Sequence, residues 1–357
     1  MNAPLLSRPV TLRLARLDDA IDCARIGAYV HEHRDGTPFH LPAWSKAVAA
    51  GCGQRAHYLI AERDVHGIVG VLPLTELHSH LFGRVLASAG FGVGGGVLAD
   101  KPEIARLLGE ACWQLAERLS CPSVELRGGP RPGPEWMVDD THYLGFERGL
   151  ASDDDAELLA IPRKQRAEVR KSLETDLSIS VGQDAADVAD HYAVYAESVR
   201  NLGTPVFPSR LFGEVLQAFG NAADVLVASH RGAAVAAVLS IYWRGTVYPY
   251  WGGGTAAARR LRANDRMYFE LMRHARARGC TRFDFGRSKV GTGAAAFKKN
   301  WGFEPRPLTY YDRVADGAAI RDANPLNPKY RLQVALWRRL PLAIANRIGP
   351  WIAKGLG

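Results

Sequence analysis

Residues 283–303 read FDFGRSKVGTGAAAFKKNWGF, and no other stretch of the chain is as informative. It begins like a β-strand in which Asp284 stands between two phenylalanines, so alternation points the carboxylate away from both rings. Three glycines then allow tight turns and a close approach of the backbone to a ligand. Lys298 and Lys299 follow, and their side chains can reach anionic charge or negative charge that develops during a reaction. The stretch therefore predicts a binding or catalytic site.

The same order of features occurs twice. In the first half, GFGVGGGVLAD precedes a helical stretch and Glu125, and in the second half YWGGGTAAA precedes a helical stretch and Asp284. Cys121 and Cys280 each stand four residues before the acid. Self-similarity at domain length indicates duplication. The alternative is coincidence in a chain with 36 glycines.

Length and composition agree with two domains. A chain of 357 residues with 47% hydrophobic content fits two cores of about 150 to 200 residues each. We expect an N-terminal domain over residues 1–150, a C-terminal domain with the active site over 151–312, and a tail over 313–357. The acidic run at residues 152–155 marks the first boundary.

Cysteine usage and hydropathy place the chain in a reducing compartment. The five cysteines form no C-x-x-C pair, so neither a disulfide framework nor a zinc site is indicated. No secretory leader and no run of 18 apolar residues appears in the sequence. We therefore expect a cytoplasmic protein without a metal or a tightly bound cofactor.

The excess positive charge lies in the tail. Residues 313–357 carry eight Lys or Arg against two Asp, so they hold +6 of the net charge of +8. Within residues 330–356, tryptophans and aliphatic residues alternate with basic ones. Such a segment can form basic amphipathic helices that lie on the inner face of the cytoplasmic membrane. A pair of helices covering the second domain is the alternative.

Hydrophobic periodicity predicts a similar order of elements in both halves. Each half has three consecutive strands, then glycines, a helix, and a strand with an acid. The expected strands of the first half are 10–14, 57–63, 68–77 and 84–91, with helices at 18–28 and 102–119. The expected strands of the second half are 225–229, 233–243 and 246–251, with helices at 163–174 and 185–202.

The basic helix at the start of the second half has two interpretations. It carries five basic residues: Arg163, Lys164, Arg166, Arg170 and Lys171. They either line a binding groove for substrate or form a solvated surface.

These motifs resemble the Fem-type family, non-ribosomal aminoacyl and acyl transferases built from tandem GNAT-like domains. In that family an Asp-containing strand is followed by an FK motif, which is Phe297-Lys298 in this sequence. Three stretches, RNLGTPVFP, FDFGRSK and NPLNPKYRLQVALWRRLP, are most similar to FemAB-like proteins that accompany exosortase/PEP-CTERM and exopolysaccharide systems. The resemblance covers nearly the whole chain. It implies an α/β (α+β) fold with two mixed, mostly antiparallel sheets flanked by helices, and a helical tail.

The resemblance also implies roles for individual residues. Acyl transfer passes through a tetrahedral oxyanion, so the site needs a positive donor and a group that removes a proton from the attacking amine. Lys298 matches the family lysine that approaches the reacting groups, and Asp284 is the candidate that orients the amine or accepts its proton. The alternatives are an ion pair of Asp284 with Arg287 or Lys298, and a surface position for Lys298. Further candidates for substrate binding are Tyr250, Arg287, Lys289 and Lys299.

The sequence leaves the donor undecided. A CoA-dependent GNAT domain has a pyrophosphate loop of the form Q/R-x-x-G-x-G/A, where backbone N–H groups bind phosphate. Residues 259–270 read RRLRANDRMYFE and have no glycine at the required positions. A charged tRNA could instead contact Arg259, Arg260 and Arg262 through its phosphates. The co-substrate is therefore aminoacyl-tRNA or acyl-CoA. The first copy is expected to be a scaffold that shapes the acceptor side.

Three classes of function follow. The first is an acyltransferase that forms an amide bond on a cell-envelope or exopolysaccharide precursor. The alternatives are an acyl-CoA-dependent GNAT N-acyltransferase and a non-catalytic adaptor at the membrane. Serine–histidine chemistry and zinc hydrolysis are disfavoured, because the sequence has neither a G-x-S-x-G nor an H-E-x-x-H motif.

Overall fold

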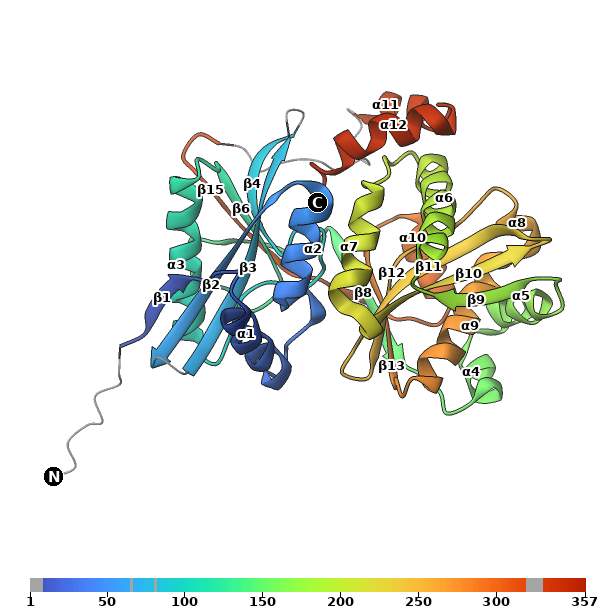
Figure 1. Cartoon of the computed structure of the whole chain (residues 1–357), viewed down its shortest axis with the longest axis horizontal. Helices are drawn as coiled ribbons and strands as arrows, with labels where there is room; N and C mark the ends of the chain where they lie inside the picture. Colours follow the sequence, from blue (N-terminus) through green and yellow to red (C-terminus); the bar gives the residue numbers. More distant parts are fainter. Residues whose placement is uncertain (1–8, 65–66, 80–81, 319–329) are drawn as a thin grey trace. The chain divides into compact units, whose positions relative to one another are not determined.

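The computed structural model describes residues 9–64, 67–79, 82–318 and 330–357 (Figure 1). Contacts divide the chain into two compact units. Unit 1 comprises Met1–Asp139, Thr309–Asp322 and Gly355–Gly357, and unit 2 comprises Asp140–Leu308 and Ala323–Lys354. The boundaries expected near residues 150 and 312 remain a prediction about domains. Residues 319–329, which include the start of the expected tail motif, lie outside the described residues.

Unit 1 is built on one mixed sheet with strand order β1-β2-β3-β4-β6-β15-β7, and β5 pairs with β3. The strands are β1 (Thr11–Leu14), β2 (Arg55–Asp64), β3 (Gly67–Ser79), β4 (Gly83–Ser88), β5 (Leu98–Ala99), β6 (Ser123–Arg127), β7 (Met137–Asp139) and β15 (Tyr310–Val314). The helices are α1 (Ala20–Glu32), η1 (Pro38–His40), α2 (Pro42–Cys52) and α3 (Pro102–Arg118). Strands β4 and β6 are parallel and pair only at Leu86↔Val124 and Ala87↔Glu125.

Unit 2 has a sheet with strand order β14-β8-β13-β12-β11-β10-β9. The strands are β8 (Tyr143–Gly149), β9 (Ser178–Gly182), β10 (Ala223–His230), β11 (Ala233–Trp243), β12 (Thr246–Gly254), β13 (Arg282–Lys289) and β14 (Pro305–Pro307). The helices are α4 (Asp154–Ala160), α5 (Arg163–Leu173), α6 (Ala185–Leu202), α7 (Ser209–Phe219), η2 (Gly220–Ala222), α8 (Ala258–Leu261), α9 (Ala263–Ala277), α10 (Gly293–Asn300), α11 (Arg331–Trp337) and α12 (Leu342–Ala353).

The two sheets have the same topology. Read from opposite edges, β1, β2, β3, β4, β6, β15 and β7 correspond in order to β9, β10, β11, β12, β13, β8 and β14. In each sheet a parallel pair, β4–β6 or β12–β13, is joined through a helix, α3 or α9. The repeat that the sequence predicts is therefore present as a repeated fold.

Each sheet is completed by a strand from the other half of the sequence. Strand β8 follows the first copy along the chain but pairs with β13. Strand β15 follows the second copy but pairs with β6. The two copies have therefore exchanged the strand that lies beside the acid-bearing strand.

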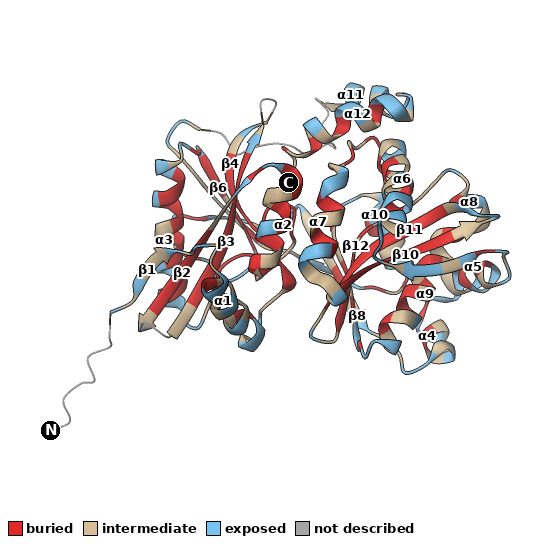
Figure 2. Cartoon of the chain, in the orientation of Figure 1, coloured by how far each residue is buried: buried red, intermediate tan, exposed pale blue. Residues whose placement is uncertain are grey.

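Local sequence signals and burial explain the main elements. Helix α6 begins where the Asp184 carboxylate accepts hydrogen bonds from the N–H groups of Ala186 and Asp187, and it ends at Gly203 in the left-handed conformation. Helix α3 buries an apolar stripe that includes Ile104, Leu108 and Leu115. Figure 2 shows that both sheets are largely buried, whereas outward helix faces are exposed.

Candidate functional site

The predicted site lies in unit 2, where the parallel strands β12 and β13 stop pairing. They pair at Thr246↔Arg282 and Val247↔Phe283. Beyond these pairs, β12 continues to Gly254 and β13 continues to Lys289. The carboxyl ends of such strands are where open α/β sheets bind ligands. Asp284 is the first residue of β13 after the paired segment.

A β-bulge follows Asp284. Against β8, Asp284 pairs with Glu147 and Arg287 pairs with Gly145, so β13 has one extra residue. Gly286 lies inside the bulge at φ +66°, a conformation that glycine adopts without strain. Its N–H donates to Oδ1 of Asp284 at 2.8 Å. The sequence Asp-Phe-Gly thus closes the turn locally.

The side chain of Lys298 completes the bulge. Thr292 caps helix α10 by accepting a hydrogen bond from the N–H of Ala295 at 3.3 Å, and Lys298 lies in the last turn of that helix. Its Nζ donates to the carbonyl oxygens of Gly286 at 3.2 Å and Arg287 at 2.9 Å. Lys298 therefore joins helix α10 to strand β13 through the carbonyl oxygens of Gly286 and Arg287.

The environment of this amine is apolar. Nζ of Lys298 lies 5.3 Å from the ring centroid of Phe146 and 5.6 Å from that of Phe285. Burial lowers the pKa of Lys298 from 10.5 to about 7; the negative charge of Asp284 opposes this shift and the positive charge of Arg287 adds to it. A pKa near 7 suits a group that takes up and returns a proton at neutral pH.

The pKa of Asp284 moves in the opposite direction. Burial raises the pKa of this carboxyl above its ordinary value, while the hydrogen bond from Gly286 and the charge of Lys298 lower it. Asp284 and Lys298 are thus two interacting titratable groups whose pKa values shift toward each other. Such pairs are a common feature of acid–base sites.

Tyr248 on β12 is a neighbour of Asp284 that the sequence argument misses. Burial raises the pKa of the Tyr248 hydroxyl, and the negative charge of Asp284 raises it further. Tyr250, the predicted residue, packs instead edge-to-face on Trp251 with centroids 4.8 Å apart. Tyr248 and Tyr250 are two positions apart on β12, and Tyr248 is the nearer of the two to the residues that pair with β13. The role of Tyr250 in substrate binding remains a prediction.

The other predicted residues have three kinds of environment. Arg287 and Lys289 lie over the Tyr143 ring, 4.8 and 5.7 Å from its centroid, on the same strand as Asp284. Lys299 on α10, Arg163 and Arg170 on α5, and Arg259 and Arg260 on α8 are exposed. Arg166 donates to the carbonyl oxygens of Leu159 and Ile161 at the end of α4. The predicted roles of Arg259 and Arg260 in binding the donor, and of the others in binding substrate, remain predictions.

Acidic residues surround the start of α9, the position that a GNAT pyrophosphate loop would occupy. Arg262 donates to Glu168 of α5 at 2.6 Å, and Gln165 of α5 donates to Asp265 at 2.6 Å. Burial raises the pKa of Asp265 to about 6. One of the three predicted donor-binding arginines is therefore paired with a carboxylate, and a second acid lies beside it.

Two general features of the described chain bear on cofactors and membranes. Among the residues that the structure describes, no three His, Cys, Asp or Glu side chains are grouped as a metal site would require. None of the helices in the described ranges has the length and hydropathy needed to span a bilayer.

Comparisons with known proteins agree with this architecture. Residues 163–299 match the family model described as an acetyltransferase (GNAT) domain. A crystal structure of FemX superposes with a TM-score of 0.63 at 13% identity, covering 90% of this chain and 99% of that chain. No curated protein sequence matches the chain.

Two further solved structures are similar. A tandem GNAT protein from the clavulanic acid biosynthesis pathway gives a TM-score of 0.54 at 13% identity, covering 87% of this chain and 100% of that chain. L-PGS from Bacillus licheniformis gives 0.53 at 15% identity, covering 89% and 97%. The predicted fold is confirmed: the chain has two mixed α/β sheets of the GNAT type, flanked by helices, in a tandem arrangement. The match of residues 163–299 to an acetyltransferase (GNAT) domain agrees with the predicted enzyme class, an acyltransferase.

Proposed function

We propose that this protein transfers an acyl or aminoacyl group to an amine at the β13 bulge, with Lys298 as the proton-transfer residue and Asp284 as its partner. One observation carries the proposal. The amine of Lys298 is held by the carbonyl oxygens of Gly286 and Arg287 beside Asp284, and its pKa is lowered to about 7. A base with a pKa near the working pH is the most effective one.

The hydrogen bonds of Lys298 leave one position for the reaction. A neutral amine has two N–H donors and one lone pair, and a protonated amine has three donors. Two donors are used by the carbonyls of the bulge. The remaining position is a lone pair in the neutral form and an N–H in the protonated form, so the same nitrogen can accept a proton and then return it.

The proposed reaction proceeds in two stages. The neutral acceptor amine attacks the carbonyl carbon of the donor, the C–N bond forms, and the amine proton passes to the lone pair of Lys298. The resulting ammonium places positive charge beside the tetrahedral oxyanion. When the intermediate collapses, the bond to the leaving oxygen or sulfur breaks, and that atom takes the proton from Lys298. The lysine returns to its neutral form.

For the donor, we favour an aminoacyl ester of tRNA over acyl-CoA. At the start of α9, Arg262 is already paired with Glu168 of α5, the carboxyl of Asp265 lies beside it, and residues 259–270 have no glycine at the loop positions, which disfavours a pyrophosphate there. Arg259 and Arg260 are exposed on α8 and are available to the phosphates of a larger donor. Acyl-CoA is the second candidate, because the family model that matches residues 163–299 describes an acetyltransferase.

For the acceptor, we propose an amine on a cell-envelope or exopolysaccharide precursor. The support is the resemblance of RNLGTPVFP and FDFGRSK to the exosortase-associated FemAB-like group. A membrane-bound precursor would be reached through the tail. Helix α12 buries Ala345, Gly349 and Ala353, and its opposite face exposes Ile344, Ile348 and Trp351.

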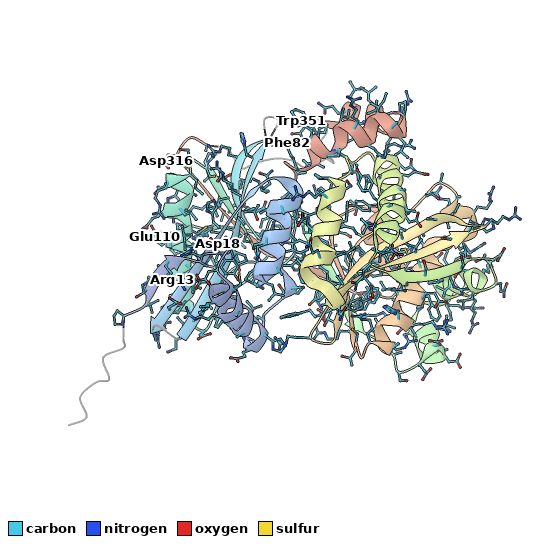
Figure 3. The ribbon with its side chains drawn as sticks, in the orientation of Figure 1. Arg13, Asp18, Phe82, Glu110, Asp316 and Trp351 are labelled. Atoms are coloured by element: carbon cyan, nitrogen blue, oxygen red, sulfur yellow. The ribbon has the colours of Figure 1, made fainter. Side chains whose placement is uncertain are left out.

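Exposure at this face is substantial. Trp351, whose side chain is labelled in Figure 3, is 52% exposed. On α11, Leu332 and Leu336 are 71% and 56% exposed. On α12, Arg347 is exposed as well. Exposed apolar residues next to basic ones are typical of helices that lie in a membrane interface.

A transfer assay with a surrogate acceptor tests the chemistry. Hydroxylamine serves as the amine, and the donors are tRNA charged with labelled amino acids in one arm and labelled acetyl-CoA in the other. We expect the purified chain to form hydroxamate from aminoacyl-tRNA faster than the spontaneous reaction, and Lys298→Met to lower that rate by about 100-fold or more. Transfer from acetyl-CoA alone would assign the second donor. Equal rates for the wild type and Lys298→Met in both arms would favour a non-catalytic adaptor.

A further inference from the structure

The segment Gly355–Gly357 seats in unit 1, although the helix before it, α12, belongs to unit 2. Gly355 and Gly357 are buried. The carbonyl oxygen of Gly357 accepts a hydrogen bond from Nη2 of Arg127 at 2.8 Å. A short glycine-rich segment thus inserts its backbone into a polar position of the first copy.

Arg127 is a buried cation, and each of its three guanidinium nitrogens donates a hydrogen bond to an oxygen. The residue is 3% exposed. Its Nε donates to Oε1 of Glu125 at 2.7 Å, and its Nη1 donates to the carbonyl oxygen of Gly92 at 3.2 Å. The third nitrogen, Nη2, donates to Gly357. Two of the three acceptors therefore belong to the sheet and its adjoining loop, and the third is supplied by the inserted segment.

The position of Arg127 corresponds to the candidate site of unit 2. It is the last residue of β6, whose parallel pairing with β4 ends at Ala87↔Glu125. The corresponding strands of unit 2, β12 and β13, diverge at Asp284. The same end of each sheet thus carries a charged side chain, Asp284 in unit 2 and Arg127 in unit 1.

The loop that surrounds this position is strained and closely packed. Ala89 and Phe91 have φ values of +40° and +63°, which are unfavourable for residues with a side chain. A Cβ on Gly96 would lie 1.9 Å from the carbonyl oxygen of Gly128, just beyond β6. Strain of this kind collects where a binding geometry must be held.

The position that Gly357 occupies accepts only a group without a side chain. A Cβ added to Gly357 would lie 2.5 to 2.7 Å from three carbon atoms of the Phe91 ring. Phe91 is 5% exposed, so its ring has little room to move. The occupant must therefore present an oxygen to Arg127 and a glycine-like methylene to Phe91.

We propose that this end of unit 1 is a second binding site, specific for a glycyl group or a similarly small carbonyl or carboxylate group, and that residues 355–357 are its internal occupant. The segment then acts as a displaceable substitute for a ligand rather than as a fixed strut. The charge of Glu125 balances that of Arg127, so the ligand is recognised by a directed hydrogen bond and by size more than by net charge.

Removal of the segment tests the proposal. The variant lacking residues 355–357 is titrated calorimetrically with the peptide Lys-Gly-Leu-Gly, which has the sequence of residues 354–357, in its free-acid and amide forms. We expect the shortened chain to bind the peptide at least tenfold more tightly than the full chain does. Preference for the acid assigns a carboxylate ligand, and equal binding of both forms assigns a carbonyl ligand.

Two controls keep the result interpretable. Lys-Ala-Leu-Ala should not bind, because its final methyl group would meet Phe91. In the full chain, Gly357→Val should eject the segment and allow Lys-Gly-Leu-Gly to bind without any truncation, which covers the case in which the shortened chain folds poorly. If neither the shortened chain nor Gly357→Val binds the peptide, the segment is a fixed strut and the proposal is wrong.

Discussion

Lys298 is a cationic residue type placed between two aromatic rings, and this placement decides its chemistry. Desolvation disfavours the charged amine, while Asp284 supports it. The two effects leave the pKa at about 7. The sequence predicts the Lys298–Asp284 pair, but the lowered pKa depends on Phe146. That ring comes from β8, about 150 positions earlier in the chain, and no local pattern predicts it.

The pH dependence of the transfer rate is the prediction at this scale. In the proposed reaction the neutral form of Lys298 is the active one, so we expect kcat/KM to rise as pH increases through about 7. Asp284→Asn removes a charge that raises the pKa of Lys298, so the rising limb of the pH profile of kcat/KM should move to lower pH. Lys298→Arg keeps the charge but cannot lose it near neutrality, so the limb should disappear.

Rate measurements from pH 5.5 to 9 on the three proteins, each with the same acceptor, check this prediction. Because the acceptor titrates identically in every series, a difference in the pH dependence of the rate between the three proteins must come from the substituted residues. A limb that stays at the same pH in Asp284→Asn would mean that Asp284 does not influence the reacting base.

At the scale of elements, the bulge in β13 connects sequence to site. The Asp-Phe-Gly sequence and the strand were predictable, since both are local. The extra residue in β13 was not, because a bulge exists only relative to a partner, here β8. The acidic run at residues 152–155, expected to mark a domain boundary, also starts helix α4, which Asp153 caps by accepting a hydrogen bond from the N–H of Ala156 at 2.8 Å.

Substitution of Gly286 tests the role of the bulge. Gly286→Ala places a side chain at φ +66°, which costs about 1 to 2 kcal/mol, and it shifts a carbonyl that holds Lys298. Gly291→Ala is the matched control, since Gly291 has φ +75° and both positions have open space for a Cβ. We expect similar losses in thermal stability but a fall in kcat of about 10- to 100-fold only for Gly286→Ala. Equal activity of the two variants would contradict this role.

The exposed face of α12 gives a second prediction for an element. Replacing Ile344, Ile348 and Trp351 by serine should lower binding to anionic phosphatidylglycerol vesicles by about tenfold or more. Each apolar side chain that enters the membrane contributes on the order of 1 kcal/mol to the free energy of binding. Leu159→Ser is the control, because Leu159 on α4 is also exposed, at 63%. Co-sedimentation at low and high salt measures the effect. Unchanged binding of the triple variant would assign this face to something other than a membrane.

At the scale of the whole molecule, the duplication was predictable and the strand exchange was not. The repeated order of glycines, helix and acid can be read from the sequence, because each copy keeps its own local pattern. Strands β8 and β15 are short segments whose partners, β13 and β6, lie far away in the sequence. Their pairing is set by the competition among long-range contacts, which one sequence does not reveal.

The exchange predicts which fragments can fold. Residues 140–308 contain every strand of the second sheet, whereas residues 151–312 lack β8 and expose the edge of β13. We expect the first fragment to unfold cooperatively on heating and the second to be unfolded or aggregated. Circular dichroism melts and amide-resolved NMR spectra compare them. If residues 151–312 melt as cooperatively as residues 140–308, the domain boundary expected from the sequence is the better one.

The exchanged strand β15 also has a consequence during synthesis on the ribosome. Strand β6 pairs through Glu125 with Asp312, so its neighbour leaves the exit tunnel only after all of the second copy has been translated. Until then the first sheet presents an open edge at β6. The first sheet therefore cannot gain its neighbour at β6 until the second copy has been translated.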